Sequence, residues 1–204
     1  MSYPRAGMGY DSIVLASASA RRSLLLTQIG VRHRAVAADV DETPHPGEAP
    51  DRYVERLAEN KARAIVRARS GAPDRPVLAA DTTVVLDGRI FGKPADEADC
   101  VGMLTALSGR RHAVLTALAL WHDGRLEQLL STSHVTFREI GPEESRRYWA
   151  SGEPAGKAGA YAIQGFAAVF VERVEGSFSG VMGLPLFETA ALLDGAGVVR
   201  WSSP

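Results

Sequence analysis

The chain has 204 residues, 46% of them hydrophobic, and a formal net charge of −1 at pH 7. A chain of this length buries a full hydrophobic core without disulfides, and its near-neutral charge gives no basic surface for nucleic acid or an anionic membrane. The single cysteine, Cys100, excludes an internal disulfide and fits a reducing compartment. Since no apolar run reaches the roughly 20 residues of a membrane-spanning helix and no signal peptide is recognisable, we expect one domain over residues 11–200 in the cytoplasm.

Apolar periodicity predicts alternating strands and helices in the first part of the chain. The run Ile13-Val14-Leu15-Ala16 is typical of a buried strand, and apolar residues recur at helical spacing from Asp51. The elements predicted here are a strand at 13–16, a helix from Arg21 to Gly30, a strand at 33–38, an acidic loop at 39–50 and a helix from 51 to about 69.

The second part of the chain adds hairpins to this pattern. Asp87-Gly88 and Asp123-Gly124 are tight-turn dipeptides between strand-like runs, and Pro142 suits the first turn of a helix. The elements predicted here are a strand at 77–80 that ends at Asp81, a strand at 84–86, a helix near 95–107, strands at 112–121 and 126–138, a short helix opened by 141–144, a strand at 167–174 and a helix at 184–193. Hairpins mixed with crossovers predict an α/β fold with a mixed twisted sheet and flanking helices.

Lysine is rare in this chain, and its positions point to phosphate chemistry. The chain has three lysines, Lys61, Lys93 and Lys157, against twenty arginines. A compact ammonium group suits close approach to a phosphate oxygen. The segment Ser17–Arg22 also suits an anion, because it joins a strand to a helix start, where N–H groups are free and serine hydroxyls and arginines gather. A serine cap followed by solvated arginines is the alternative interpretation of that segment.

Asp81 stands at the predicted end of an apolar strand, in Asp81-Thr82-Thr83. Sheets of α/β proteins place binding crevices at such strand ends. A carboxylate there can ligate a hard divalent cation or accept a proton from water. The alternative is an aspartate that merely leaves the sheet for a turn, but an acid with sheet residues on both sides is costly unless it is paired or metal-bound.

Residues 153–165 are rich in glycine and alanine around Lys157 and Gln164. Small residues let a ligand approach the backbone, and a glutamine amide offers both an acceptor and donors for the N3–H and O4 edge of a pyrimidine. An ordinary glycine-rich loop is the alternative. The five histidines have no zinc-binding spacing, so His112 is expected to serve packing or a backbone hydrogen bond.

Together these segments resemble the Maf family of nucleoside triphosphate pyrophosphatases, from about Ile13 to Leu193. The stretches that carry the resemblance are Leu15–Arg22, Glu59–Ala62, Ala80–Thr82, Gly92–Pro94, Leu107–Gly109 with His112, Glu153–Gly165 and Gly183–Leu186. Each is weak alone, whereas all of them in this order are specific. Residues 157–165 are similar to the branch of the family that acts on dTTP and UTP. The resemblance implies two lobes around a central cleft, as in inosine triphosphate pyrophosphatases.

The resemblance also implies roles for individual residues. Asp81 corresponds to the proton acceptor, Lys61 and Lys93 to catalytic lysines, and Glu42 with Asp81 to the metal-binding carboxylates. A solvated loop acid is the alternative interpretation of Glu42. The substrate-binding positions that it implies are Ser17, Ser19, Arg21, Arg22, Thr82, Lys157 and Gln164. Gly156 replaces an acid that is usual in the family, which puts a charge partner for Lys157 in doubt.

The activity implied is attack of water on the α-phosphorus of a pyrimidine nucleoside triphosphate, with Mg²⁺ or Mn²⁺ as cofactor. Its purpose would be to clear noncanonical or excess nucleotides, and the resemblance also suggests a homodimer. One alternative is the same hydrolysis of 7-methyl-GTP or another modified nucleotide. Another is a nucleotide-binding inhibitor of septum formation with little catalysis. Near-neutral charge and the lack of an aromatic platform disfavour single-stranded nucleic-acid binding.

Overall fold

The computed structural model describes residues 9–68 and 74–201. Seven strands form one mixed sheet in the order β2-β1-β3-β5-β6-β7, with β4 paired to β3. The strands are β1 (Ile13–Leu15), β2 (His33–Ala35), β3 (Val77–Leu86), β4 (Arg89–Phe91), β5 (Arg111–His122), β6 (Arg125–Phe137) and β7 (Val171–Glu175). The helices are α1 (Ala20–Gln28), α2 (Pro50–Ala68), α3 (Glu97–Leu107), α4 (Pro142–Ala150), η1 (Ala158–Ala160), η2 (Phe166–Phe170), α5 (Phe178–Met182) and α6 (Leu186–Gly195).

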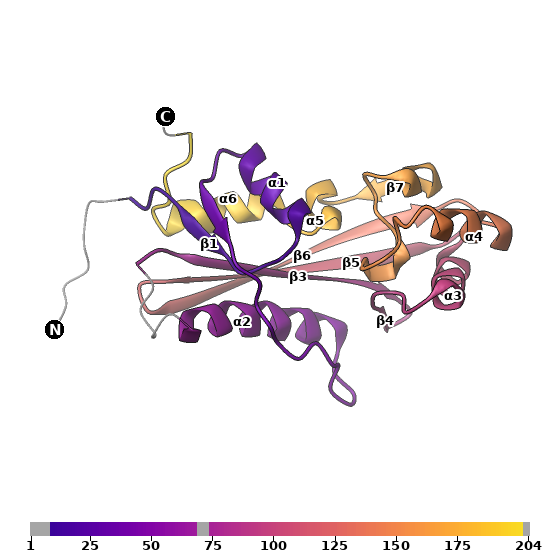
Figure 1. The fold of residues 1–204 in the computed structure, drawn as a ribbon, viewed down its shortest axis with the longest axis horizontal. Helices are drawn as coiled ribbons and strands as arrows, with labels where there is room; N and C mark the ends of the chain where they lie inside the picture. The colour runs from indigo at the N-terminus through magenta and orange to yellow at the C-terminus, as the bar shows by residue number, and fades with distance from the viewer. Residues whose placement is uncertain (1–8, 69–73, 202–204) are drawn as a thin grey trace.

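Helices cover both faces of the sheet, as Figure 1 shows. Helix α2 lies along one face, while α1, α5 and α6 lie on the other. At the far end of the long strands, α3, α4 and η1 pack around a separate apolar cluster that includes Leu104, Phe137 and Tyr161. The molecule therefore has two lobes that share β3, β5 and β6, and the mixed α/β architecture predicted from the sequence is confirmed.

Local sequence signals account for several helix ends. The Ser19 hydroxyl accepts the Arg22 amide at the start of α1, and Asp96 caps α3 in the same way. Pro142 occupies the first turn of α4, where no backbone donor is needed. Helix α2 buries one apolar face against the sheet and carries charge on the other. None of the helices in the described part of the chain is long and apolar enough to cross a membrane.

One edge of β3 has a gap that determines where a ligand can enter. On that edge β1 pairs with Val77 and Leu78 only, and β4 pairs with residues 84–86. The opposite edge is paired with β5 along residues 77–85. Residues 79–83 therefore lack a neighbouring strand on one side, and residues 81–83 line a cavity there.

The structure departs from the sequence predictions in several places. Strand β3 does not end at Asp81 but runs through it to Leu86, so Asp81 lies in mid-strand and it is the neighbouring β1 that ends. The strand predicted at 167–174 begins only at Val171, as β7, because residues 166–170 form the 3₁₀ helix η2, in which Glu153 accepts the amides of Phe166 and Ala167. Helix α5 was not predicted, although Ser177 caps its start. Arg69, the predicted end of α2, lies outside the described residues.

Substitution of Gly159 tests how tightly η1 packs on the sheet. Gly159 has a positive φ of 68°, and a Cβ atom there would lie 2.8 Å from Val84 Cγ2. We expect Gly159→Ala to lower the free energy of unfolding by about 1–3 kcal/mol more than Gly124→Ala does. Gly124 is the matched control, because its φ of 77° imposes the same backbone strain with no atom within 4 Å. Equal losses in urea denaturation would show that η1 is not held against β3.

Candidate active site

A cavity of about 570 Å³ lies at the gap in the edge of β3. Its wall contains five cationic side chains and only two carboxylates. The charged residues of the wall are Arg21, Arg22, Lys61, Lys93, Lys157, Glu42 and Asp81. This excess of positive charge in a concave site suits a polyanionic ligand. The cavity brings together all of the residues that the sequence assigned to the site except Gln164.

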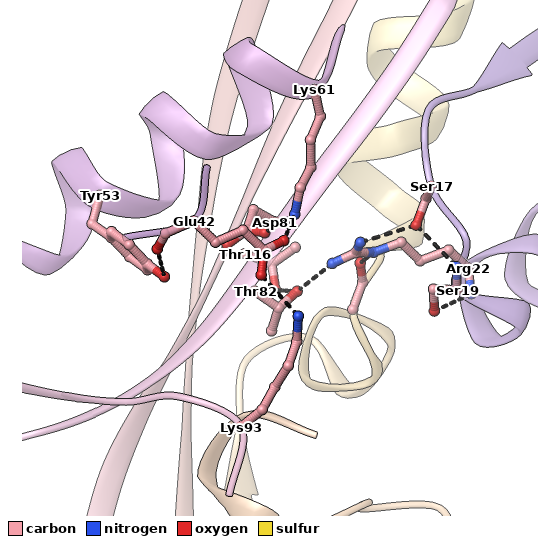
Figure 2. Close-up of polar contacts among 11 residues, drawn as sticks. Ser17, Ser19, Arg22, Glu42, Tyr53, Lys61, Asp81, Thr82, Lys93 and Thr116 are labelled. Carbon is pink, nitrogen blue, oxygen red and sulfur yellow. Dashed lines mark hydrogen bonds and ion pairs between the residues drawn. The ribbon is translucent and has the colours of Figure 1, made fainter. Parts of the chain in front are cut away.

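Lys61 joins two carboxylates at the centre of the cavity. Its ammonium group lies 2.6 Å from Asp81 Oδ1 and 2.7 Å from Glu42 Oε1 (Figure 2). Lys93 approaches the other oxygen of Glu42 at 2.8 Å. Lys61 comes from α2, Asp81 from β3, and Glu42 and Lys93 from loops, so the network fastens four separate segments. Lys61 and Asp81 are 8% and 7% exposed, which makes their ion pair a buried one.

Burial and charge act in opposite directions on the two acids. Burial raises the pKa of Asp81 above the ordinary aspartate value, although the charges of Lys61 and Arg22 oppose the rise. Burial also acts to raise the pKa of Glu42, but the hydrogen bonds and charges of Lys61 and Lys93 outweigh it and lower that pKa to about 2. Glu42 is therefore a fixed negative charge, whereas Asp81 is the stronger base and the better proton acceptor.

Arg22 holds the loop before α1 against the sheet. Its guanidinium donates to the carbonyl of Gly183 at 2.8 Å, to Ser17 Oγ at 3.2 Å and to Thr82 Oγ1 at 3.1 Å. Ser17 also accepts the amide of Ser19 at 3.2 Å. These contacts fix the loop at the start of a helix, where free N–H groups favour an anion.

Arg21 and Lys157 are the cations still free to bind a ligand. Among the residues that the structure describes, neither forms an ion pair; Arg21 donates only to the Met182 carbonyl at 3.4 Å and Lys157 to the Ala155 carbonyl at 3.3 Å. Partial burial, and then the charge of Arg21, lower the pKa of Lys157. No acid in this part of the chain forms a close ion pair with Lys157, although the charge of Glu153 acts to raise its pKa. Two like charges side by side gain most when an anion lies between them.

Gln164 lies away from the cavity. It is exposed in the turn between η1 and η2 and does not line the wall. The adjacent turn is fixed by Glu153, which accepts the Tyr148 hydroxyl at 2.8 Å as well as the amides of η2. The role of Gln164 in reading the base thus remains a prediction that this geometry does not support.

Sequence reasoning missed three side chains at this site. Tyr53 donates from its hydroxyl to the carbonyl of Glu42 at 3.0 Å, and it was read only as an apolar position of α2. Thr116 hydrogen-bonds Thr82 across the sheet at 3.0 Å. Tyr161 lines the cavity, and its hydroxyl lies 2.9 Å from His112 Nε2, a side-chain partner rather than the backbone one expected. The packing role expected of His112 is confirmed by its edge-on contacts with Phe137 and Tyr161. A polar residue within the buried run of β5 was the available signal for Thr116.

The donor set fits a cation that arrives with its ligand. No three histidine, cysteine or acidic side chains gather within residues 9–68 and 74–201. Only Glu42 and Asp81 approach one another through Lys61. Mg²⁺ is commonly bound by one or two carboxylates together with phosphate oxygens and water, and Glu42 and Asp81 are the two carboxylates that this cavity offers.

Taken together, the fold and the cavity define an α/β protein with a cation-rich cavity beside a buried carboxylate. Residues 12–196 match the family described as Maf-like protein. The chain therefore belongs to the Maf family.

Curated relatives match over nearly the whole chain. The dTTP/UTP pyrophosphatase of Cupriavidus metallidurans is 55% identical over 194 residues, which is 91% of this chain and 97% of the relative. The protein of the same name from Nitrosomonas europaea is 54% identical over 198 residues, or 92% of this chain and 96% of the relative. Among solved structures, the Staphylococcus aureus Ham1 protein matches 62% of this chain and 71% of its own, at 18% identity and a TM-score of 0.42, a similarity too low to compare sites.

The two lysines of the network have different expected effects on stability. Lys61→Met removes the partner of a buried carboxylate, and we expect a loss of about 3 kcal/mol in the free energy of unfolding at pH 7. Lys93→Met, whose side chain is 59% exposed, is the matched control and should cost less than about 1 kcal/mol. Both values come from urea titration.

The loss in Lys61→Met should also depend on pH. Without Lys61 the pKa of Asp81 rises further, because one of the charges that lowers it is gone. Protonation of a buried acid whose pKa is raised stabilises the folded protein. The difference in the free energy of unfolding between Lys61→Met and the unmodified protein should therefore shrink as the pH falls. Equal losses in both variants, or a difference independent of pH, would contradict a buried Lys61–Asp81 pair.

Proposed function

We propose that this protein hydrolyses dTTP, UTP and related pyrimidine nucleoside triphosphates to the monophosphate and pyrophosphate. The observation that carries the proposal is the buried Asp81, held by Lys61 inside a cavity whose wall has five cations. The names of the relatives, at 54–55% identity over nine-tenths of the chain, supply the substrate. Removal of noncanonical or excess nucleotides is the purpose that this activity would serve.

In this mechanism the cations bind the triphosphate and neutralise the leaving pyrophosphate. Arg21 and Lys157 are the first contacts available, since neither has an ionic partner among the described residues. Lys93 can exchange part of its contact with Glu42 for a phosphate oxygen, because it is largely exposed. Electrostatic stabilisation of this kind is usually the largest contribution to such reactions.

Asp81 is the group that would accept the proton. Lys61 holds its Oδ1 atom and so fixes the direction of the carboxylate. Water attacks the α-phosphorus, the new P–O bond forms as the bond to the bridging oxygen breaks, and the proton of the water passes to Asp81. The raised pKa of Asp81 favours this transfer.

Glu42 and Asp81 are the residues that would hold a divalent cation, together with phosphate oxygens. When bound, Mg²⁺ or Mn²⁺ would withdraw charge from the phosphoryl group and lower the pKa of the attacking water. The Tyr53 hydroxyl, bonded to the backbone of Glu42, keeps that loop in reach of the cavity.

Asp81→Asn should lower turnover of UTP by roughly 10²–10⁴-fold, because it removes the proton acceptor but leaves an oxygen for Lys61. Pyrophosphate release measures the rate, and circular dichroism checks the fold. Asp123→Asn is the matched control, since Asp123 lies in an exposed hairpin turn where asparagine is favoured. A rate for Asp81→Asn equal to that of the control would remove Asp81 from the mechanism.

A panel of triphosphates, assayed with and without a chelator, tests the substrate and the cation together. We expect UTP and dTTP to be turned over faster than GTP and 7-methyl-GTP, with activity lost in chelator and restored by excess Mg²⁺. Faster turnover of 7-methyl-GTP would show that the protein hydrolyses methylated nucleotides instead. Tight binding of UTP without turnover at any metal concentration would instead indicate a nucleotide-binding regulator.

A further inference from the structure

A chain of hydrogen bonds runs from β3 to β5 on the face of the sheet that α1 and α5 cover. Arg22 Nη2 donates to Thr82 Oγ1 at 3.1 Å, the hydroxyls of Thr82 and Thr116 lie 3.0 Å apart, and Thr116 Oγ1 donates to the Gly180 carbonyl at 2.8 Å. The chain therefore links α1, β3, β5 and α5 through two threonines that face each other in the β3–β5 register. Thr116 is 1% exposed, so water cannot substitute for any of its partners.

The ends of this chain determine the direction of every hydrogen in it. A guanidinium can only donate and a carbonyl can only accept, whereas a hydroxyl has one hydrogen and two lone pairs. The hydrogen of Thr116 must point to Gly180, because the two oxygens would otherwise repel at 2.8 Å. The hydrogen of Thr82 is then committed to Thr116. Since Arg22 occupies one lone pair of Thr82, that hydroxyl has a single lone pair left for a ligand.

Thr82 stands at the border of the apolar part of the cavity. On the same face of the sheet, the next cross-strand pair after Thr82–Thr116 is Val84–Val114, and both valines line the cavity. Val181 and Met182 line it from α5. An apolar surface of this kind suits a planar base, and an oxygen that can only accept repels phosphate oxygens. Because Thr82 lines the cavity beside these apolar residues, its remaining lone pair is available to a donor at the edge of a base.

We propose that Thr116 is a positioning residue that makes Thr82 an obligatory acceptor and thereby selects bases with an N–H group at the pairing edge. Uracil and thymine present N3–H there, whereas the N3 atom of cytosine is itself an acceptor. The site thus favours UTP over CTP through a side chain that the substrate never touches. This inference rests on the proposed hydrolysis of pyrimidine triphosphates.

The test is the ratio of kcat/KM for UTP to kcat/KM for CTP in Thr116→Val. Valine has the shape of threonine but frees the hydrogen of Thr82, which can then turn toward the cavity and donate to cytosine N3. In the unmodified protein, cytosine N3 and Thr82 Oγ1 are both acceptors, so binding of CTP leaves them unpaired. We expect the UTP-to-CTP ratio of kcat/KM to fall by about tenfold in Thr116→Val, because this penalty on CTP is removed. Thr116→Ser restores the hydroxyl and should restore the ratio of the unmodified enzyme.

Two further outcomes keep the inference falsifiable. A merely structural role would lower kcat/KM for UTP and CTP by the same factor, and an unchanged ratio in Thr116→Val would overturn the proposal while leaving the pyrophosphatase activity in place. If Thr116→Val does not fold, as judged by its melting temperature, Thr116→Ala gives the same comparison. Absence of turnover of both nucleotides by the unmodified protein would refute the proposed function itself.

Discussion

The site depends on one buried ion pair, that between Lys61 and Asp81. A carboxylate in the middle of a sheet strand is costly unless it is paired, and α2 supplies the partner from the face that Asp81 points to. The same ammonium group also binds Glu42 and so draws an irregular loop onto the sheet. One lysine thereby opposes the rise that burial causes in the pKa of Asp81, fixes the direction of that carboxylate and positions the second one.

The gap in the edge of β3 allows this pair to act on a ligand. Successive residues of a strand point to opposite faces, so Asp81 faces α2 while Thr82 faces α1 and α5. Because β1 reaches only to Leu78 of β3 and β4 only to Val84, both side chains border one cavity. The acid and the paired lysines lie on one side of the strand, and the arginine loop and the apolar wall lie on the other. A nucleotide with a charged and an apolar end matches that division.

Sequence reasoning predicted the α/β class, most elements and the set of cations, because apolar periodicity and local motifs report such features directly. It failed where contacts with residues distant in the sequence determine the local structure. The end assigned to the strand at Asp81 was wrong because the polar Asp81-Thr82-Thr83 interrupts an apolar pattern that the sheet continues through. The 3₁₀ helix at residues 166–170 depends on Glu153, and the hydroxyl direction of Thr82 depends on Thr116 and Gly180. No local pattern encodes such contacts.

The measurement that tests this account most directly is a crystal structure with a non-hydrolysable α,β-imido analogue of UTP and Mg²⁺. The account predicts the triphosphate between the Lys61–Asp81 pair and the Arg21–Lys157 side of the cavity, with the α-phosphorus nearest Asp81 and the base on the valine wall. A triphosphate bound elsewhere, or one whose α-phosphorus is remote from Asp81, would contradict it.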